Sequence, residues 1–177
     1  MDTKGILSTI EGQPYKDVKR LWKLFEKQYN SIGVQTFNHP NVTFQGGEVT
    51  DIKVLVREFR DFAVEIEPFK IEVDGLGRFD RSVIYLRVKK SREIARINEV
   101  ANQLLKTRCV KVFEEYSPER WIPHITVAMG DLLESEFDKA WSSLSGVKFG
   151  FEQQLHNICL VNRHPSGKIK ILRKFPL

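Results

Sequence analysis

Hydrophobic residues recur every three or four positions in four segments of the chain, the spacing that places them on one face of an α-helix. This pattern predicts helices over residues 15–29, 51–64, 92–106 and 132–144. In the last segment, Leu133 is expected on the apolar face, and Asp131 with Glu134 is expected to cap the first turn. Stripes of this kind pack into a core, so they indicate no cofactor site.

Short runs rich in β-branched and aromatic residues lie between the helices and predict strands. The runs cover residues 6–10, 41–45, 69–73, 83–88, 110–114, 122–128, 147–151, 158–162 and 168–172. The segments Gly75-Leu-Gly77 and Pro165-Ser-Gly167 have the residues of tight turns and are expected to fold the flanking strands into hairpins. The mixture of helices and strands predicts an α+β protein.

The predicted elements follow the same order twice, as strand, helix, strand, helix and then a strand pair. This order suggests approximate internal repeats over residues 1–80 and 81–177. We therefore expect residues 1–177 to form a single bilobal domain. Its two lobes would be similar and related by a pseudo-twofold axis, each an antiparallel sheet with helices on its outer face, around a central cleft.

The composition is that of a folded globular protein, with 41% hydrophobic and 29% charged residues. No apolar run approaches the roughly 18 residues of a membrane span, and the first residues lack the apolar centre of a signal peptide. We expect a soluble, cytoplasmic monomer with no membrane association. The net charge of +5 is spread along the chain, which mildly favours an anionic partner and excludes a histone-like polycation.

Metal and nucleotide motifs are not found in the sequence. Cys109 and Cys159 lie in apolar stretches, which is typical of buried thiols without a chemical role. The histidines have no HExxH or CxxC companions, and the glycine pairs lack the lysine or further glycine of phosphate-binding loops. The sequence therefore predicts no metal and no cofactor.

Candidate chemistry lies in two of the predicted strands. In Pro123-His124-Ile125-Thr126-Val127, His124 and Thr126 are two residues apart, so both side chains leave the same face of a strand. An imidazole can transfer a proton near neutral pH, and the adjacent hydroxyl can donate a hydrogen bond to a phosphate oxygen. The segment Pro40-Asn41-Val42-Thr43-Phe44 places Asn41 and Thr43 in the same way.

The two motif segments, their separation and the amphipathic helix after each resemble the two-histidine phosphoesterase superfamily, which includes the 2′-5′ RNA ligase and cyclic phosphodiesterase family. Its members are bilobal and carry one His-x-Thr/Ser motif in each lobe. The resemblance implies a metal-independent phosphoric diester hydrolase that acts on the 2′,3′-cyclic phosphate or 2′-5′ linkage of an RNA end or nucleotide. It also implies that His124 transfers a proton while Thr43 and Thr126 hold the phosphate.

One position departs from the family pattern, because Asn41 stands where the first motif histidine belongs. An asparagine can hold a phosphate by hydrogen bonds, but it cannot exchange a proton near neutral pH. His39, two residues earlier, is a candidate replacement on the same strand face. Pro40 favours an edge, a bulge or a strand start, any of which can redirect His39, so the spacing permits His39 to reach the cleft but does not place it there. Three hypotheses stay open: a working phosphodiesterase, an impaired relative that binds RNA ends or nucleotides without turnover, and a structural scaffold that uses only the duplicated fold.

Four residues are predicted to contact the substrate besides the catalytic set. Asn41 lies in the first motif, and Tyr85 and Arg87 alternate with apolar residues and are expected on the strand face opposite the core. Arg120 precedes the second motif and is expected to reach the same cleft. An arginine suits this role because its guanidinium can bind a phosphate through two hydrogen bonds.

Overall fold

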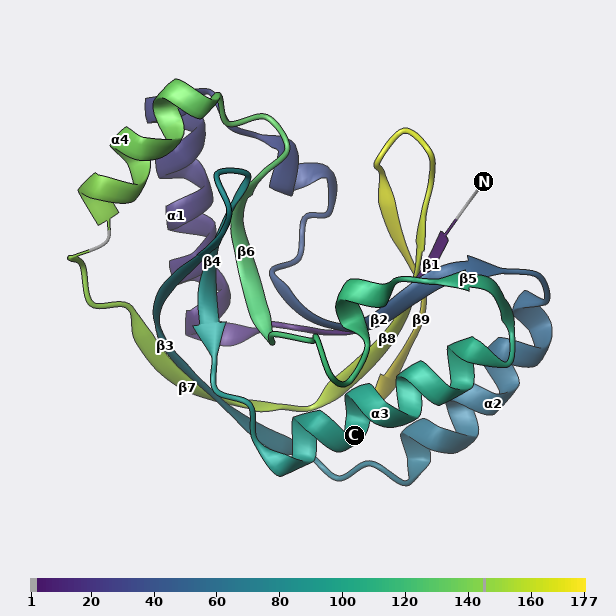
Figure 1. Ribbon diagram of the computed structural model, residues 1–177. Helices are drawn as coiled ribbons and strands as arrows, with labels where there is room; N and C mark the ends of the chain where they lie inside the picture. Colours follow the sequence, from purple (N-terminus) through teal and green to yellow (C-terminus); the bar gives the residue numbers. More distant parts are fainter. Residues whose placement is uncertain (1–2, 145) are drawn as a thin grey trace.

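The structure, a computed structural model, describes residues 3–144 and 146–177 and is an α+β fold, as predicted. Two antiparallel sheets, with strand orders β5-β2-β1-β8-β9 and β6-β4-β3-β7, are combined with four α-helices (Figure 1). The strands are β1 (Thr3–Thr9), β2 (Asn41–Val49), β3 (Phe69–Phe79), β4 (Val83–Val88), β5 (Cys109–Val112), β6 (His124–Met129), β7 (Gly150–Leu155), β8 (Asn157–Arg163) and β9 (Ile169–Pro176). The helices are α1 (Gly12–Tyr29), α2 (Ile52–Val64), α3 (Arg92–Lys106) and α4 (Glu134–Leu144), with short 3-10 turns η1 (Gly33–Thr36) and η2 (Glu114–Tyr116).

The two sheets form two lobes, each with helices on its outer face. Helices α2 and α3 cover the five-stranded sheet, and α1 and α4 lie beside the four-stranded sheet (Figure 1). The uncovered faces of the two sheets look toward each other. The predicted bilobal architecture is thus confirmed.

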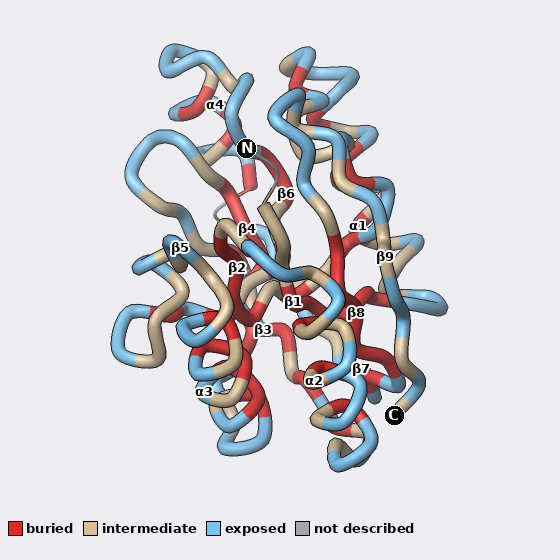
Figure 2. Tube along the Cα trace, turned by 90° about the vertical axis from the view of Figure 1, so that its right-hand side faces the viewer, coloured by how far each residue is buried: buried red, intermediate tan, exposed pale blue. Residues whose placement is uncertain are grey.

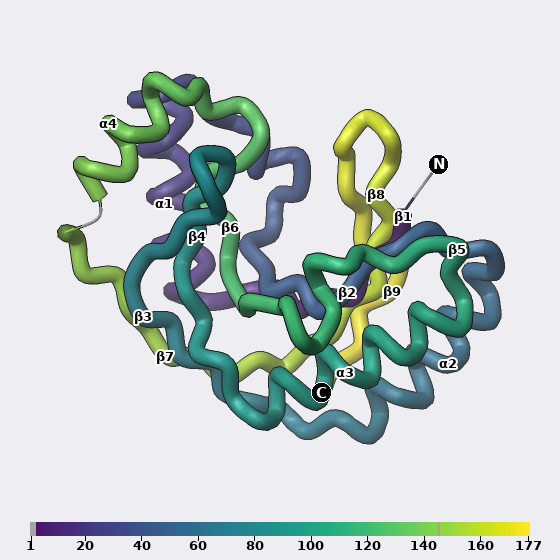
Figure 3. Tube along the Cα trace, in the orientation of Figure 1, coloured from purple at the N-terminus to yellow at the C-terminus, as the bar shows by residue number. Residues whose placement is uncertain are grey.

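The lobes do not coincide with the two halves of the sequence. Strand β1 pairs with β2 in one sheet as β4 pairs with β6 in the other, which is the correspondence that the repeated order suggested. However, α1 packs against β6, and α3 packs against β2 (Figure 3). The first helix of each half therefore covers the motif strand of the other half.

The main core lies between each sheet and its helices, where buried positions concentrate (Figure 2). On α1, the buried residues Val18, Leu21, Trp22 and Phe25 are the ones that the helical spacing places on one face. A second, small cluster on the five-stranded sheet consists of Leu7, Phe37, Cys159 and Val161. No helix in the described part of the chain is long and apolar enough to cross a lipid bilayer.

The prediction of a hairpin turn at Gly75-Leu-Gly77 is wrong. These residues lie inside β3, where the register with β4 shifts between Val73 and Leu76, and the hairpin follows only after Phe79. Gly75 has a φ of 73°, which a glycine adopts without strain, so it forms a bulge within the strand. The hairpin predicted at residues 165–167 is confirmed, because it joins β8 to β9.

The predicted cap of the last helix is also wrong. The Asp131 carboxylate accepts hydrogen bonds from the backbone amides of Ile32 and Gly33, both at 2.6 Å, and from the Ser31 hydroxyl at 2.7 Å. The loop before η1 has amides without backbone partners, and the carboxylate satisfies them across a long sequence separation. Leu133 lies before the helix and is 68% exposed, not on its apolar face.

Both cysteines are free thiols. Cys159 is fully buried, as expected, whereas Cys109 is only half-buried. Burial raises the pKa of each thiol to about 11, and nearby Glu48 adds to the shift at Cys109. The thiols therefore stay protonated at neutral pH, where they are poor nucleophiles.

Candidate active site

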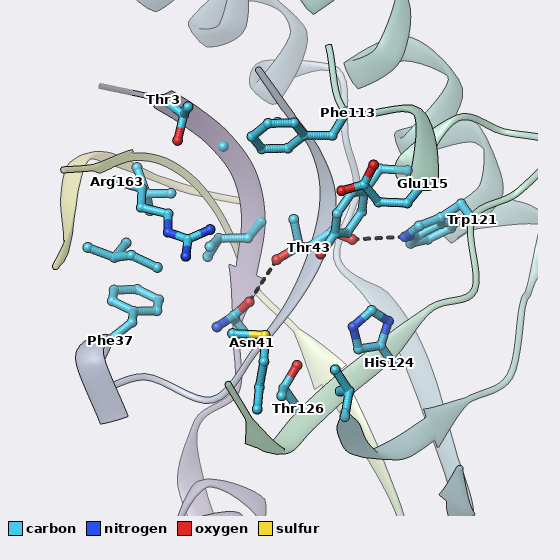
Figure 4. A pocket seen from close by; sticks show the side chains of 18 of the residues that line it. Thr3, Phe37, Asn41, Thr43, Phe113, Glu115, Trp121, His124, Thr126 and Arg163 are labelled. Carbon is cyan, nitrogen blue, oxygen red and sulfur yellow. Dashed lines mark hydrogen bonds between the residues drawn. The ribbon is translucent and has the colours of Figure 1, made fainter. Parts of the chain in front are cut away.

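The two motif strands meet at a cleft of about 800 Å³ between the lobes. Asn41 and Thr43 from β2 and His124 and Thr126 from β6 all line it (Figure 4). The four side chains are half-buried, and the intervening residues point into the core, as strand alternation predicts. The structure thus brings both motifs to one place.

The His124 ring is held in one orientation. Its Nδ1 lies 2.7 Å from the carbonyl oxygen of Ile122, and since a carbonyl only accepts, Nδ1 carries the proton of the neutral ring. The rings of Phe79, Tyr85 and Tyr116 surround it at centroid distances of 5.1, 5.2 and 6.4 Å. Burial lowers the pKa of His124, and the hydrogen bond to Ile122 opposes part of this shift. The neutral ring therefore keeps a free electron pair on Nε2 and can act as a base.

Asn41 makes the same backbone contact from the other motif strand. Its Nδ2 donates to the carbonyl oxygen of His39 at 2.9 Å, two residues earlier, just as His124 bonds two residues back. Its Oδ1 accepts a hydrogen bond from the Thr43 hydroxyl at 3.0 Å. The amide thus takes the place of the Nδ1 side of a histidine but offers no atom that titrates near neutral pH.

Both motif strands carry a bulge directly after the threonine. Thr43 pairs with β1 in register, Phe44 is the extra residue, and pairing resumes one residue later. On β6, Thr126 pairs with β4 and Val127 is the extra residue. A bulge bends the strand and redirects the residues beyond it, so each motif ends at a matching change of strand direction.

An indole binds the backbone of each threonine. Trp121 Nε1 donates to the carbonyl oxygen of Thr43 at 2.9 Å, and Trp22 Nε1 donates to that of Thr126 at 3.0 Å. Each tryptophan lies far from its threonine in sequence. These bonds fix the backbone of the residues whose hydroxyls face the cleft.

His39 does not line the cleft. Strand β2 begins at Asn41, so the alternation that would have turned His39 toward Thr43 does not extend to it. Its exposed ring lies on Phe37, with centroids 5.2 Å apart. Burial, and then the positive charges of Lys174 and Lys19, lower the pKa of His39. The interpretation of His39 as the replacement base is therefore not supported by its position.

Tyr85 is buried, not on an open strand face as predicted. Its ring packs on Phe79 at 4.3 Å between centroids and supports the His124 ring from behind. Gly77 makes room for it, because a Cβ there would lie 2.4 Å from the Tyr85 ring. Tyr85 thus positions the histidine and does not itself line the cleft.

The two predicted arginines have different positions. Arg87 is exposed, but its Nε donates to the carbonyl oxygen of Asp74 at 2.9 Å, and it does not line the cleft. Arg120 does line the cleft and forms a long ion pair with Glu114, at 3.5 Å. Only Arg120 is therefore placed to contact a ligand there.

Sequence reasoning missed several residues of the cleft wall. They include Lys4, Phe37, Phe113, Trp121 and Arg163. The apolar and β-branched residues along 158–162 predicted the strand, but nothing in the sequence showed that it pairs with β1. The side chain of Arg163 therefore became visible as a cleft residue only in the fold (Figure 4).

Three comparisons bear on the identity of this fold. A model of the protein family described as the 2′-5′ RNA ligase superfamily matches residues 15–167. The chain is 27% identical over 162 residues to "Putative phosphoesterase OB1230" of Oceanobacillus iheyensis, covering 89% of this chain and 87% of that one. Its fold is similar to the crystal structure of TT0787 of Thermus thermophilus (TM-score 0.66, 17% identity, 99% and 97% of the chains). It is also similar to that of Escherichia coli LigT complexed with 3′-AMP (TM-score 0.64, 14% identity, 100% and 99%).

Proposed function

Because the chain belongs to the 2′-5′ RNA ligase superfamily, we propose that its cleft hydrolyses the 2′,3′-cyclic phosphate at an RNA or nucleotide end. The observation that carries the proposal is the His124 ring, whose Nε2 is free and whose motif faces a second motif across the cleft. The likeness to a relative named as a phosphoesterase supports the same class of reaction.

His124 acts as the general base in the proposed reaction. Its Nε2 takes a proton from a water molecule as the water oxygen bonds to phosphorus, and one of the two ribose P–O bonds breaks. The departing ribose oxygen takes up a proton from solvent, and His124 later returns its proton to solvent, so the proton balance closes. The lowered pKa of His124 keeps the base form present at neutral pH.

The two threonines and Asn41 bind the phosphate. The hydroxyls of Thr43 and Thr126 can rotate to donate to the non-bridging oxygens, whose negative charge increases in the transition state. Asn41 Nδ2 has a second N–H beyond the one bonded to His39, and this N–H donates to the departing oxygen. Without a second imidazole, the departure of this oxygen is assisted by a hydrogen bond and not by proton transfer. We expect a slower enzyme than one with two histidines.

Hydrolysis of a short RNA that ends in a 2′,3′-cyclic phosphate tests the proposal, with a chelator present because we propose that no metal ion is needed. The wild-type protein should open the ring, and His124→Asn should not, while retaining RNA binding. Arg57→Gln on the outer helix α2 is the matched control for handling and folding, since Arg57 is exposed and lies outside the cleft lining. A wild-type protein that binds the RNA and leaves it unchanged would reject the proposed reaction in favour of binding without turnover.

A further inference from the structure

Arg163 is a cation without a partner inside the cleft. It is the last residue of β8, and its guanidinium extends into the cleft on the side of Asn41 that lies away from His124 (Figure 4). Within residues 3–144 and 146–177 its guanidinium forms no side-chain hydrogen bond or ion pair, although Glu115 also lines the cleft. An arginine held in a concave site without a carboxylate partner is suited to bind an anion from outside.

Arg163 and the motif threonine begin from well-separated positions on the five-stranded sheet. Thr43 pairs with Leu7 on β1, and Leu7 pairs with Cys159 on β8, four residues before Arg163. Four residues along a strand and two strand spacings across give a separation of about 16 Å between the Cα atoms of Thr43 and Arg163. The guanidinium thus offers the cleft a cation that comes from a different strand and a different level of the sheet from the motif residues.

The wall between these two polar ends is apolar. Leu7 and Val161 point to this side of the sheet, and Gly5 on β1 pairs with Val161. Phe37 packs over them from the segment before β2. Such a surface fits the faces of a ribose and a base, which present few groups that need hydrogen bonds. Polar groups at both ends and an apolar wall between them match a nucleotide that carries phosphate at both ends.

We propose that Arg163 binds the 5′-phosphoryl group of the nucleotide whose cyclic phosphate lies at the motif residues. This assignment rests on the proposed function for the position of the reacting end. In a mononucleotide the group is a 5′-phosphate, and in RNA it is the phosphodiester to the preceding nucleotide. The protein is thus selective for phosphorylated or oligomeric ends over a cyclic phosphate with a free 5′-hydroxyl.

Binding of product-like nucleotides tests the proposal without depending on turnover. Calorimetry measures the affinities for adenosine 2′-monophosphate and adenosine 2′,5′-bisphosphate. The same comparison is made between adenosine 3′-monophosphate and adenosine 3′,5′-bisphosphate. Wild type should bind each bisphosphate about tenfold more tightly than its monophosphate, as a charged hydrogen-bonded pair provides. Arg163→Gln should abolish that preference and leave the monophosphate affinity unchanged.

The control variant is Arg57→Gln on α2, which carries the same net charge as Arg163→Gln but lies outside the cleft. It should keep the tenfold preference, which separates a local contact from general attraction of the more charged ligand. Equal affinities for both ligands in wild type, or a preference that persists in Arg163→Gln, would overturn the proposal.

Measurements of hydrolysis separate the proposed role of Arg163 from the proposed reaction at His124. Three substrates are compared: adenosine 2′,3′-cyclic phosphate, its 5′-phosphorylated form, and a dinucleotide ending in the cyclic phosphate. The last two should share a higher kcat/KM that Arg163→Gln removes; a gain confined to the dinucleotide would show recognition of a second nucleoside and contradict the phosphate assignment. If no substrate is hydrolysed while the bisphosphate preference still depends on Arg163, the reaction is rejected and the anion site stands.

Discussion

The two motif strands share the same backbone arrangement, which we call their frame, but differ in the chemistry of one side chain. Each has a bulge after its threonine and an indole N–H on the threonine carbonyl, and the first residue of each motif donates to a carbonyl two residues back. They differ at one side chain, where β6 has His124 and β2 has Asn41. The backbone geometry of the motif is therefore the same in both strands, whereas only β6 has a side chain that can transfer a proton near neutral pH.

The surroundings of His124 and Asn41 also differ, and each set of neighbours suits the side chain that it holds. Three aromatic rings enclose His124, and burial lowers its pKa. Asn41 has instead the Thr43 hydroxyl as its second partner. An aromatic enclosure matters for a group that titrates, because it sets the pKa, whereas an amide needs only hydrogen-bond partners.

The largest effect is expected when β6 is made like β2. His124→Asn keeps a donor for the Ile122 carbonyl, as Asn41 does for His39, but removes the base. We expect kcat for the cyclic phosphate to fall by about 10² to 10⁴-fold, with the circular dichroism spectrum unchanged. Activity that stays within a few fold of wild type would mean that His124 is not the base.

The reverse change makes β2 like β6. Asn41→His adds a second imidazole whose Nδ1 can bond to the His39 carbonyl and whose Nε2 can protonate the departing oxygen. We expect kcat to rise by at least about tenfold, measured on the same substrate. Asn41→Gln is the matched control, since it keeps the amide and should give no gain. An unchanged kcat in Asn41→His would show that proton supply to the departing oxygen does not limit the rate.

The pH dependence of kcat/KM should distinguish the wild-type protein from Asn41→His. The base must be neutral, so wild-type kcat/KM should rise with pH through the pKa of His124 and then stay level. Because burial lowers this pKa from its ordinary 6.5, the midpoint should lie below 6.5. Asn41→His should add a falling limb at higher pH, because its new histidine must be protonated to act as an acid. A bell-shaped profile in wild type would reveal a second titrating group.

A smaller effect is expected from the shared frame. Trp121→Phe removes the indole N–H from the Thr43 carbonyl and keeps most of the ring packing. The loss of one hydrogen bond is worth about 1 kcal/mol, so we expect unfolding in urea to become easier by about that amount and kcat to fall by no more than about fivefold. Trp22→Phe is the matched change at the other motif and should behave alike. A large effect at only one tryptophan would break the equivalence of the two frames.

The sequence predicted the helices and the motif strands well because these depend on local spacing. The apolar face of α1 is an example, since the periodic positions Val18, Leu21, Trp22 and Phe25 are all buried. Helix α3 shows the limit. Asn98 is buried on it, and its Nδ2 donates to the carbonyls of Phe44 and Tyr116 at 2.7 and 2.9 Å. No hydrophobic pattern identifies a polar residue that satisfies distant backbone groups.

The candidate active site was predictable only where its residues follow from local spacing along the chain. His124 and Thr126 share a strand face by simple alternation, and the parallel pattern at Asn41 and Thr43 followed from aligning the two segments. Arg163 and Asp131 depend on which strands and loops become neighbours, which local spacing does not encode. Tyr85 was misplaced because the aromatic ring over it belongs to β3, a different strand.

The exchange of helices and strands between the two halves of the chain bears on which residues can stand at the two motif positions. Helix α1 and strand β3 come from the first half but join the lobe of β4 and β6, while α3 and β8 cross in the opposite direction. The arrangement resembles that of a domain-swapped dimer whose two subunits are joined end to end. In a dimer of identical chains, any change in the motif would appear at both positions of the cleft. A single chain has no such constraint, so the two motif positions can carry different side chains, as His124 and Asn41 do.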